Sequence, residues 1–186
     1  MSLSLLAEAV REALHEATGL PHPQIVIGPP HEAAKQQEDK ATDSDHLCVF
    51  FYRMGYSGFP TDAASDDPLY LSAFCLITAL GGRPSSGMPA PGESELKQIG
   101  SVLECFHRNP VLRLKNKSGD DLAQLQIVPT QLSLDDINHL WATQNNTPYR
   151  LSLAYEFSLL PVPLTARAEY SGPRVQTVVI NTEVKP

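Results

Sequence analysis

The chain has 186 residues, of which 42% are hydrophobic, as in an ordinary globular protein with one domain and a sizeable core. Its formal net charge is -7 and its 14 Lys and Arg residues are scattered, which excludes the basic track of a nucleic-acid-binding protein. Glu8, Arg11 and Glu12 interrupt the N-terminal leucines, and every apolar run is shorter than a membrane span. We therefore expect synthesis in the cytoplasm without a signal peptide, and neither a nucleic acid nor a membrane as a partner.

The first part of the chain predicts one amphipathic helix followed by strands. The helix covers Leu3–Ala17, because apolar residues recur there every three or four positions. Ile25–Ile27 predicts a short strand, and the polar stretch His31–Asp45 predicts a mobile loop or a short helix. His46–Arg53 is apolar at successive positions, which favours a strand in the middle of a sheet.

The next elements are a strand, a helix and a second strand. Leu69–Leu80 fits helical spacing, but its aromatic and β-branched residues favour a strand. Glu93–His107 begins with acids and ends with bases, as helices prefer. Leu122–Val128 predicts a further strand. The helix over Glu93–His107 has an expected buried face that consists of Leu96, Ile99, Leu103 and Phe106.

A capped helix and a long strand follow. Ser133 and Asp136 have the spacing of a capping box at the start of a helix that runs to Gln144. From Tyr149 to Leu160 the apolar period changes to two, which predicts a strand with one buried face. The residues expected on that face are Tyr149, Leu151, Leu153, Tyr155, Phe157 and Leu159.

The sequence contains no familiar catalytic, cofactor or metal motif. The glycine-rich segment Gly81–Gly92 lacks a Walker lysine, and no Gly-x-Ser-x-Gly elbow occurs. The 6 histidines never occur at a helical spacing that would let two of them bind one metal ion. Cys48, Cys75 and Cys105 lie far apart in apolar runs, so we expect reduced core thiols. We expect no enzyme, no catalytic residue, no cofactor and no metal site.

Several of these segments, taken in order, resemble one known family. CLITAL, ELKQIGSVLECFHRNPVL, LSLDDINHLW and YRLSLAYEFSLLPVP are similar to segments of the cap, or tail-tube terminator, proteins of extracellular contractile injection systems. These systems are phage-tail-like particles that drive a rigid tube into a target cell. The similarity spans roughly Leu3 to Pro163. It implies a homo-hexamer that forms a ring on the distal end of the inner tube, stops its polymerisation and anchors the last sheath layer.

The resemblance and the patterns together predict an α+β domain over residues 1–164, with a mixed, largely antiparallel sheet flanked by helices, as in phage tail terminators. Its partners would be the inner tube protein and the sheath protein, and no cofactor would be needed. After synthesis the protein would be assembled into an extracellular particle.

Residues 165–186 form an extension with a strand-prone segment, and this segment is the expected partner interface. Such a segment either adds to a sheet edge in a neighbouring subunit or in the sheath, or returns to pair within its own domain. The interface residues are Arg174, Val175, Gln176, Thr177, Val178, Val179 and Ile180.

Two other functions fit the sequence. A phage head-to-tail connector, or another ring adaptor, would share the architecture. A small-ligand-binding protein or an enzyme would instead show a concave pocket with convergent polar groups and shifted pKa values.

Overall fold

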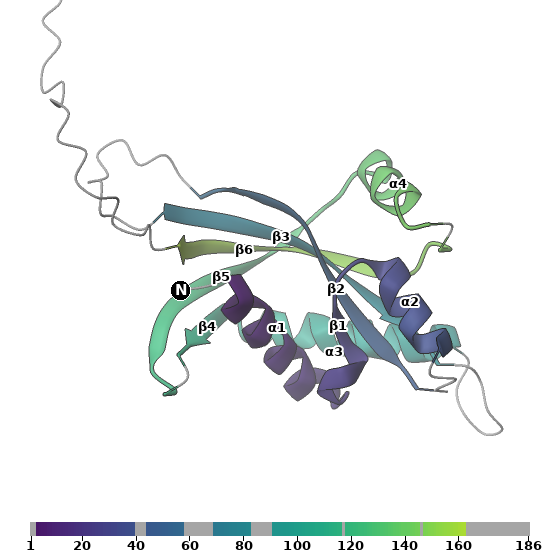
Figure 1. The fold of residues 1–186 in the computed structure, drawn as a ribbon, viewed down its shortest axis with the longest axis horizontal. Helices are drawn as coiled ribbons and strands as arrows, with labels where there is room; N and C mark the ends of the chain where they lie inside the picture. The colour runs from purple at the N-terminus through teal and green to yellow at the C-terminus, as the bar shows by residue number, and fades with distance from the viewer. Residues whose placement is uncertain are drawn as a thin grey trace, which may run out of the picture.

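A computed structural model describes residues 3–39, 44–57, 69–82, 91–116, 118–145 and 147–162. Within these residues a mixed six-stranded sheet has the strand order β1-β2-β3-β6-β5-β4 (Figure 1). β1 and β2 are parallel, and every other pair of neighbours is antiparallel. The strands are β1 (Ile25–Ile27), β2 (His46–Tyr56), β3 (Leu69–Leu80), β4 (Val111–Lys115), β5 (Asp121–Thr130) and β6 (Ser152–Val162). The predicted α+β class is confirmed.

The α-helices flank this sheet on both sides. They are α1 (Leu3–Thr18), α2 (Pro30–Asp39), α3 (Pro91–Arg108) and α4 (Leu134–Ala142), with a short 3-10 helix, η1 (His22–Gln24), between α1 and β1. α1 and α3 lie on the same side of the sheet (Figure 1). The predicted strand over Leu69–Leu80 is confirmed as β3.

The main core lies between the sheet and the two helices α1 and α3. The predicted stripe of α1 is confirmed, because Leu6, Val10 and Leu14 are its buried residues. The ring of Phe106 on α3 meets Tyr155 and Phe157 of β6 edge-on, with centroids 5.0 and 6.1 Å apart. Edge-on ring contacts of this kind stabilise a core beyond the burial of apolar area alone.

A smaller apolar cluster lies between the sheet and α2. In it Ala33 of α2 packs with Val26, Cys48 and Leu80 from β1, β2 and β3. β2 therefore buries both of its faces near its start, since Leu47 belongs to the main core. This arrangement confirms the prediction of an interior strand. The sequence predicts a loop or a short helix for His31–Asp45. The first part of this stretch is helical and belongs to α2.

Strand β6 departs from the regular alternation that the sequence predicts. It begins at Ser152, and the register between β3 and β6 shifts after Leu71, which pairs with Leu160. Leu159 adopts φ 64° and is 43% exposed, whereas Leu160 is 1% exposed. A β-bulge inserts one residue and so exchanges the two faces beyond it. The expected burial of Leu159 is therefore wrong, and Tyr149 and Leu151 are also exposed.

Helix α3 turns a different face to the core from the one predicted. Ile99, Val102 and Phe106 are buried, as a 3-4 spacing allows, but Leu96 and Leu103 are exposed. The sequence pattern predicts Leu96 and Leu103 on the buried face because they are apolar. Polar Glu95 and Gln98 take the buried positions instead.

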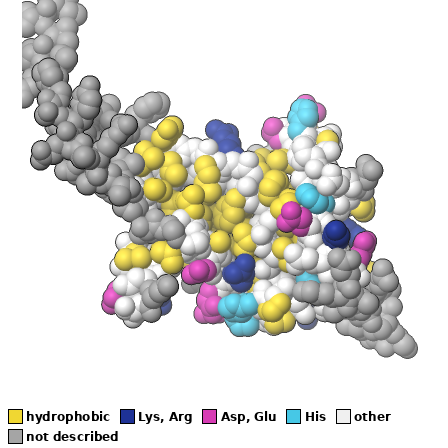
Figure 2. Space-filling view, viewed as in Figure 1, with side chains coloured by type: hydrophobic (Ala, Val, Ile, Leu, Met, Phe, Trp, Pro, Cys, Tyr) yellow, Lys and Arg dark blue, Asp and Glu magenta, His cyan; other side chains and the backbone are white. Residues whose placement is uncertain are grey.

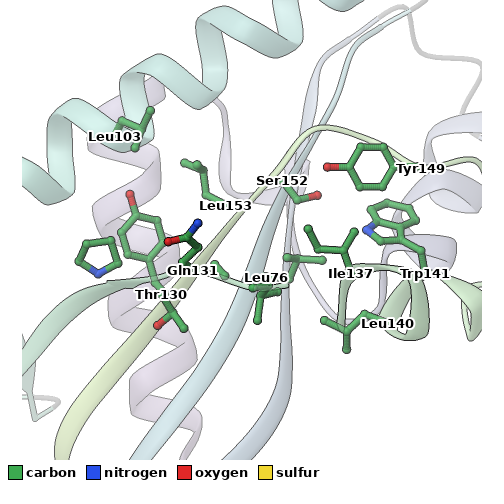
Figure 3. A pocket seen from close by; sticks show the side chains of 14 residues that line it. Leu76, Leu103, Thr130, Gln131, Ile137, Leu140, Trp141, Tyr149, Ser152 and Leu153 are labelled. Atoms are coloured by element: carbon green, nitrogen blue, oxygen red, sulfur yellow. The ribbon is translucent and has the colours of Figure 1, made fainter. Parts of the chain in front are cut away.

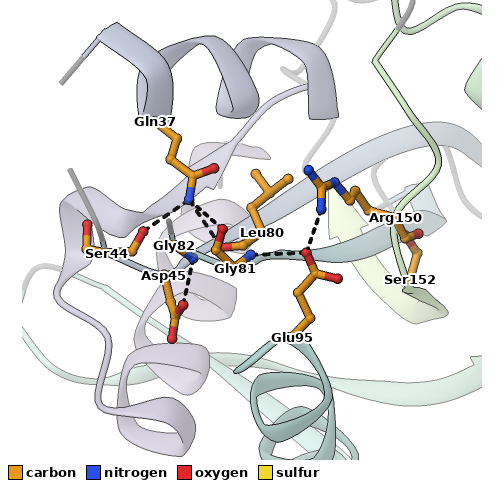
Figure 4. Close-up of polar contacts among 9 residues, drawn as sticks. All are labelled: Gln37, Ser44, Asp45, Leu80, Gly81, Gly82, Glu95, Arg150 and Ser152. Carbon is orange, nitrogen blue, oxygen red and sulfur yellow. Dashed lines mark hydrogen bonds and ion pairs between the residues drawn. The ribbon is translucent and has the colours of Figure 1, made fainter. Parts of the chain in front are cut away.

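The burial of Glu95 is explained by a polar junction that joins several segments (Figure 4). Its carboxylate accepts a hydrogen bond from the backbone N–H of Gly81 at 3.2 Å and pairs with Arg150 at 3.0 Å. The Gln37 side-chain amide donates to the carbonyl oxygens of Ser44 and Gly81, each at 3.1 Å. A Cβ at Gly81 would lie 2.4 Å from a backbone oxygen at the start of α3, so only glycine fits there.

Strand β4 is the one described strand that the sequence prediction lacks. Its five residues bury Leu112 and Leu114 and expose Val111, Arg113 and Lys115. A strand this short gives only two core positions, which is too little alternation to recognise. Its pairing with β5 places it at the edge of the sheet.

The bulge in β6 predicts opposite outcomes for two adjacent leucines. Leu160→Ala should lower the free energy of unfolding by about 2–5 kcal/mol, because it empties a buried site. Leu159→Gly should change it by less than about 1 kcal/mol, because glycine relieves the positive φ and little burial is lost. Urea denaturation of both variants checks this, and equal losses would contradict the bulged register.

Candidate partner-docking surfaces

The predicted interface residues Arg174–Ile180 lie outside the described residues, so the structure does not test them. Two hollows on the described surface are the candidates for partner binding. The first, which we call the α4 groove, has a volume of about 250 Å³. It lies between α4, the place where β5 and β6 separate, and Leu103 of α3 (Figure 3). Its lining residues are Leu76, Leu103, Pro129, Thr130, Gln131, Leu132, Ile137, Leu140, Trp141, Tyr149, Ser152, Leu153, Ala154 and Tyr155.

The α4 groove exists because β5 leaves the sheet before β6 begins. The ladder between β3 and β6 continues to the pair Thr78–Ser152, whereas the ladder between β5 and β6 stops at Thr130–Ala154. Beyond Thr130 the chain turns away into α4. The start of β6 is therefore open on the side that β5 covers elsewhere.

Helix α4 is held by the predicted capping box. The Ser133 hydroxyl accepts from the backbone N–H of Asp136 at 3.1 Å, and the Asp136 carboxylate accepts from the Ser133 N–H. Hydrogen bonds from Ser133 lower the pKa of Asp136, so this carboxylate is ionised at neutral pH. The cap thus gives α4 a defined start at the border of the groove.

Trp141 lines the groove and carries a buried, unpaired hydrogen-bond donor. It is 8% exposed, and its ring contacts Tyr149 at a centroid distance of 5.3 Å. Its indole N–H is buried and has no acceptor among the residues that the structure describes. A buried donor without an acceptor is costly, so this N–H lowers the stability of the isolated chain.

The chemistry of the α4 groove is that of binding. None of its lining residues is Asp, Glu, His, Lys, Arg or Cys. Burial raises the pKa of the Tyr155 phenol, so this group stays protonated and neutral. The groove therefore lacks an acid–base pair or an activated nucleophile and instead offers apolar contact area.

The second hollow, which we call the α1–β4 slot, has a volume of about 380 Å³ and lies beside the edge strand. The backbone N–H of Ile127 donates to the carbonyl oxygen of Pro110 at 2.8 Å, so Pro110 directs its carbonyl towards β5. Along an antiparallel edge strand, successive residues direct their backbone groups alternately towards the neighbouring strand and away from it. Val111 and Arg113 therefore direct their backbone N–H and C=O groups away from β5. The slot is lined by Leu5, Glu8, Ala9, Glu12, Ala13, Glu16, Leu112, Arg113 and Lys115.

Small side chains and a row of acids line the slot on the side of α1. Ala9 and Ala13 are small, so helix α1 leaves room beside the edge of β4. Glu8, Glu12 and Glu16 form an acidic row along the same helix. An extended segment with small apolar residues and a cationic end would match both features.

The buried cysteines do not supply a nucleophile. Burial raises the pKa of Cys48 to about 12 and also raises the pKa of Cys75. All three thiols are free, as predicted, although Cys105 is only partly buried. No helix of the described chain is long and apolar enough to span a membrane.

Comparisons with known proteins connect this fold to contractile injection systems. A PVC sheath/tube terminator in the extended state aligns with a TM-score of 0.57 at 20% identity, over 100% of this chain and 65% of that one. The tube-terminating cap of the anti-feeding prophage aligns with a TM-score of 0.55 at 17% identity, over 97% of this chain and 62% of that one. This chain thus spans less than two thirds of either protein, and at these identities the likeness shows the fold.

The search of curated proteins found no match. The family model described as the Pvc16 N-terminal domain matches residues 4–177, nearly the whole length of the sequence. This chain therefore belongs to the Pvc16 N-terminal domain family.

Proposed function

We propose that this protein is the structural cap of an extracellular contractile injection system. The family match over residues 4–177 carries the proposal, and the similarity to two tube-terminating proteins supports it. In this function the protein forms a homo-hexameric ring on the distal end of the inner tube. The ring stops tube polymerisation and holds the last sheath layer, and it needs neither catalysis nor a cofactor.

A ring requires each copy to present two different surfaces, one to each neighbour. α4 and β4 lie at opposite ends of the molecule (Figure 1). The α4 groove and the α1–β4 slot are therefore on separate flanks, as a head-to-tail interface demands. Both flanks would be covered by a neighbouring copy in the assembled ring.

The α1–β4 slot would receive residues Arg174–Ile180 of the adjacent copy as an added strand. The side chains of this segment alternate, so Val175, Thr177 and Val179 would point to one face of the sheet. Arg174 would lie beside the acidic row of α1, which gives the pairing a favourable charge contact. The backbone groups of β4 would supply hydrogen bonds.

The chain between β6 and this segment is long enough for the exchange. Residues 163–173 separate the end of β6 from Arg174. At about 3.3 Å per residue they span up to roughly 36 Å, which exceeds the width of several paired strands. In the alternative arrangement, the segment Arg174–Ile180 returns to the β4 edge of its own chain and makes no contact with a neighbouring copy.

The α4 groove would receive an apolar side chain of the other neighbour. Its volume of about 250 Å³ suits one or two side chains and is small for a cofactor. That side chain would pack against the rings of Trp141 and Tyr149, which line the groove. This contact would set the angle between successive copies in the ring.

Deletion of the gene should produce particles with tubes of uncontrolled length and with loosely attached sheaths. The full chain supplied in trans should restore tubes of uniform length, measured by electron microscopy. Normal tube lengths in the deletion strain would contradict the cap function. Association with a capsid in place of a sheath would instead favour a phage connector.

A chain truncated after Thr165 tests the strand exchange separately from the cap function. It should remain folded, because the described helices and strands lie before that residue. Its attachment to assembled tubes should fall, measured by pull-down and by complementation of the deletion strain. Full attachment of the truncated chain would show that the extension is not needed for attachment, and it would leave the proposed cap function unaffected.

Arg113→Pro tests the acceptor edge, with Arg113→Ala as its matched control. Both variants lose the exposed ion pair with Asp121, 3.8 Å apart, which contributes little. Only proline removes the outward N–H that an added strand would use, and an edge position tolerates it. Proline should weaken self-association in solution, followed by native mass measurement, while alanine should not. Equal association of the two variants would contradict docking at β4.

Trp141→Phe tests the α4 groove, with Tyr149→Phe as the control on the neighbouring ring. The free energy of unfolding of the isolated Trp141→Phe chain should stay within about 1 kcal/mol of the original, because removal of the buried, unpaired N–H offsets part of the lost packing. Its incorporation into particles should fall, since the groove loses part of the apolar wall that the neighbour would contact. Unchanged incorporation would show that no neighbour contacts this part of the groove.

A further inference from the structure

Three potential metal ligands come together where α1 ends and the chain turns back through η1. They are Glu12 and His15 on α1 and His22 at the start of η1, and one ligand atom from each lies within 4.8 Å of the others. The His22 Nε2 and the Glu12 carboxylate are 3.3 Å apart, and the two imidazole rings have centroids 4.5 Å apart. We propose that this cluster binds a divalent transition-metal ion, with zinc as the best fit.

The spacing of the cluster matches a tetrahedral site. Zinc binds histidine nitrogen and carboxylate oxygen at about 2.0–2.2 Å, which puts neighbouring ligands roughly 3.4 Å apart. The Glu12–His22 pair already has this separation. The remaining pairs lie within 4.8 Å, so they must approach by at most about 1.4 Å to reach the spacing of zinc ligands. Two imidazoles and a carboxylate, with water in the fourth position, are an established zinc ligand set.

His15 is oriented as metal-binding histidines usually are. Its Nδ1 lies 2.7 Å from the carbonyl oxygen of Leu20. A carbonyl oxygen only accepts hydrogen bonds, so Nδ1 carries the proton and Nε2 keeps the lone pair that a metal needs. Such a backbone contact fixes the orientation of the ring and its tautomer. The acceptor is itself rigid, because Leu20 is buried in the core.

The local fold brings the three ligands together. Glu12 and His15 are three residues apart on one helix face. Gly19 then adopts φ 72°, which ends α1 and returns the chain over the helix. His22 thereby arrives beside residues that precede it by seven and ten positions. Helical spacing between histidines does not predict this cluster, because His15 and His22 lie on opposite sides of the turn at Gly19.

Without a metal ion the cluster has little stabilising value of its own. The side chains of His22 and Glu12 are 49% and 55% exposed, and ion pairs this exposed contribute little. A bound ion would join α1 to η1 and hold the start of β1 against the helix. Since Glu12 also lines the α1–β4 slot, the ion would fix one side chain of the acidic row.

Zinc titration of the full chain tests the site, followed by isothermal calorimetry at neutral pH. We expect one zinc ion per chain, and a melting temperature that rises by roughly 5 °C at a hundredfold excess over Kd and falls back with EDTA. His22→Gln and Glu12→Gln should each weaken binding by about tenfold or more. His107→Gln, an exposed histidine on α3 outside the cluster, should bind like the original chain.

Cobalt(II) gives an independent readout, because a four-coordinate site produces strong visible absorption that His22→Gln should abolish. His22 and Glu12 are exposed, so their variants should fold, and circular dichroism verifies this. No saturable zinc binding by the full chain would overturn the proposal. Equal affinities of His22→Gln and His107→Gln would overturn it as well. None of these outcomes depends on the cap function.

Discussion

The pairing of β3 with β6 is the contact on which the rest of the structure depends. β6 comes last among the described strands, yet it lies between β3 and β5, so it alone joins the β1-β2-β3 half of the sheet to the β5-β4 half. Phe157 of β6 is fully buried at this joint, under the edge of Phe106 from α3. Contacts between segments so distant in sequence form late in folding, because their loop-closure entropy must first be overcome. The register of this one pair also positions both ends of β6, and with them the α4 groove.

The two faces of the sheet have different environments, and this difference favours assembly. α1 and α3 bury one face, whereas α2 packs over the other face only at β1, β2 and β3. Exposed apolar side chains therefore remain on the strands, and Tyr70, Val111, Leu122 and Val128 are among them. The space-filling view shows apolar side chains gathered over the middle of the visible face (Figure 2). Exposed apolar area of this kind marks contact with other proteins more often than a binding site for a small polar substrate.

The sequence predicts the locally determined parts of this structure and fails where distant contacts decide. The cap at Ser133, the stripe of α1 and the burial of Tyr155 and Phe157 follow from neighbours within a few residues. The bulge at Leu159 does not, because β6 must leave β5 to follow β3, and only the assembled sheet imposes that divergence. The apolar pattern of α3 predicts Leu103 in the core, but this residue lines the α4 groove. The docking surfaces were beyond sequence reasoning for the same reason, since each combines elements far apart in the chain.

In the proposed ring β4 would receive a strand from a neighbouring copy, and an edge strand with that function must also avoid random partners. Unpaired strand edges invite aggregation, and natural proteins protect them by shortness and by charge. β4 has five residues, and Arg113 and Lys115 are exposed among them. The acidic row of α1 stands beside these bases, so an incoming strand meets charges of both signs. A strand of arbitrary sequence would leave some of them unpaired. Selectivity at such an edge therefore comes from side chains around the slot, because backbone hydrogen bonds are the same for every sequence.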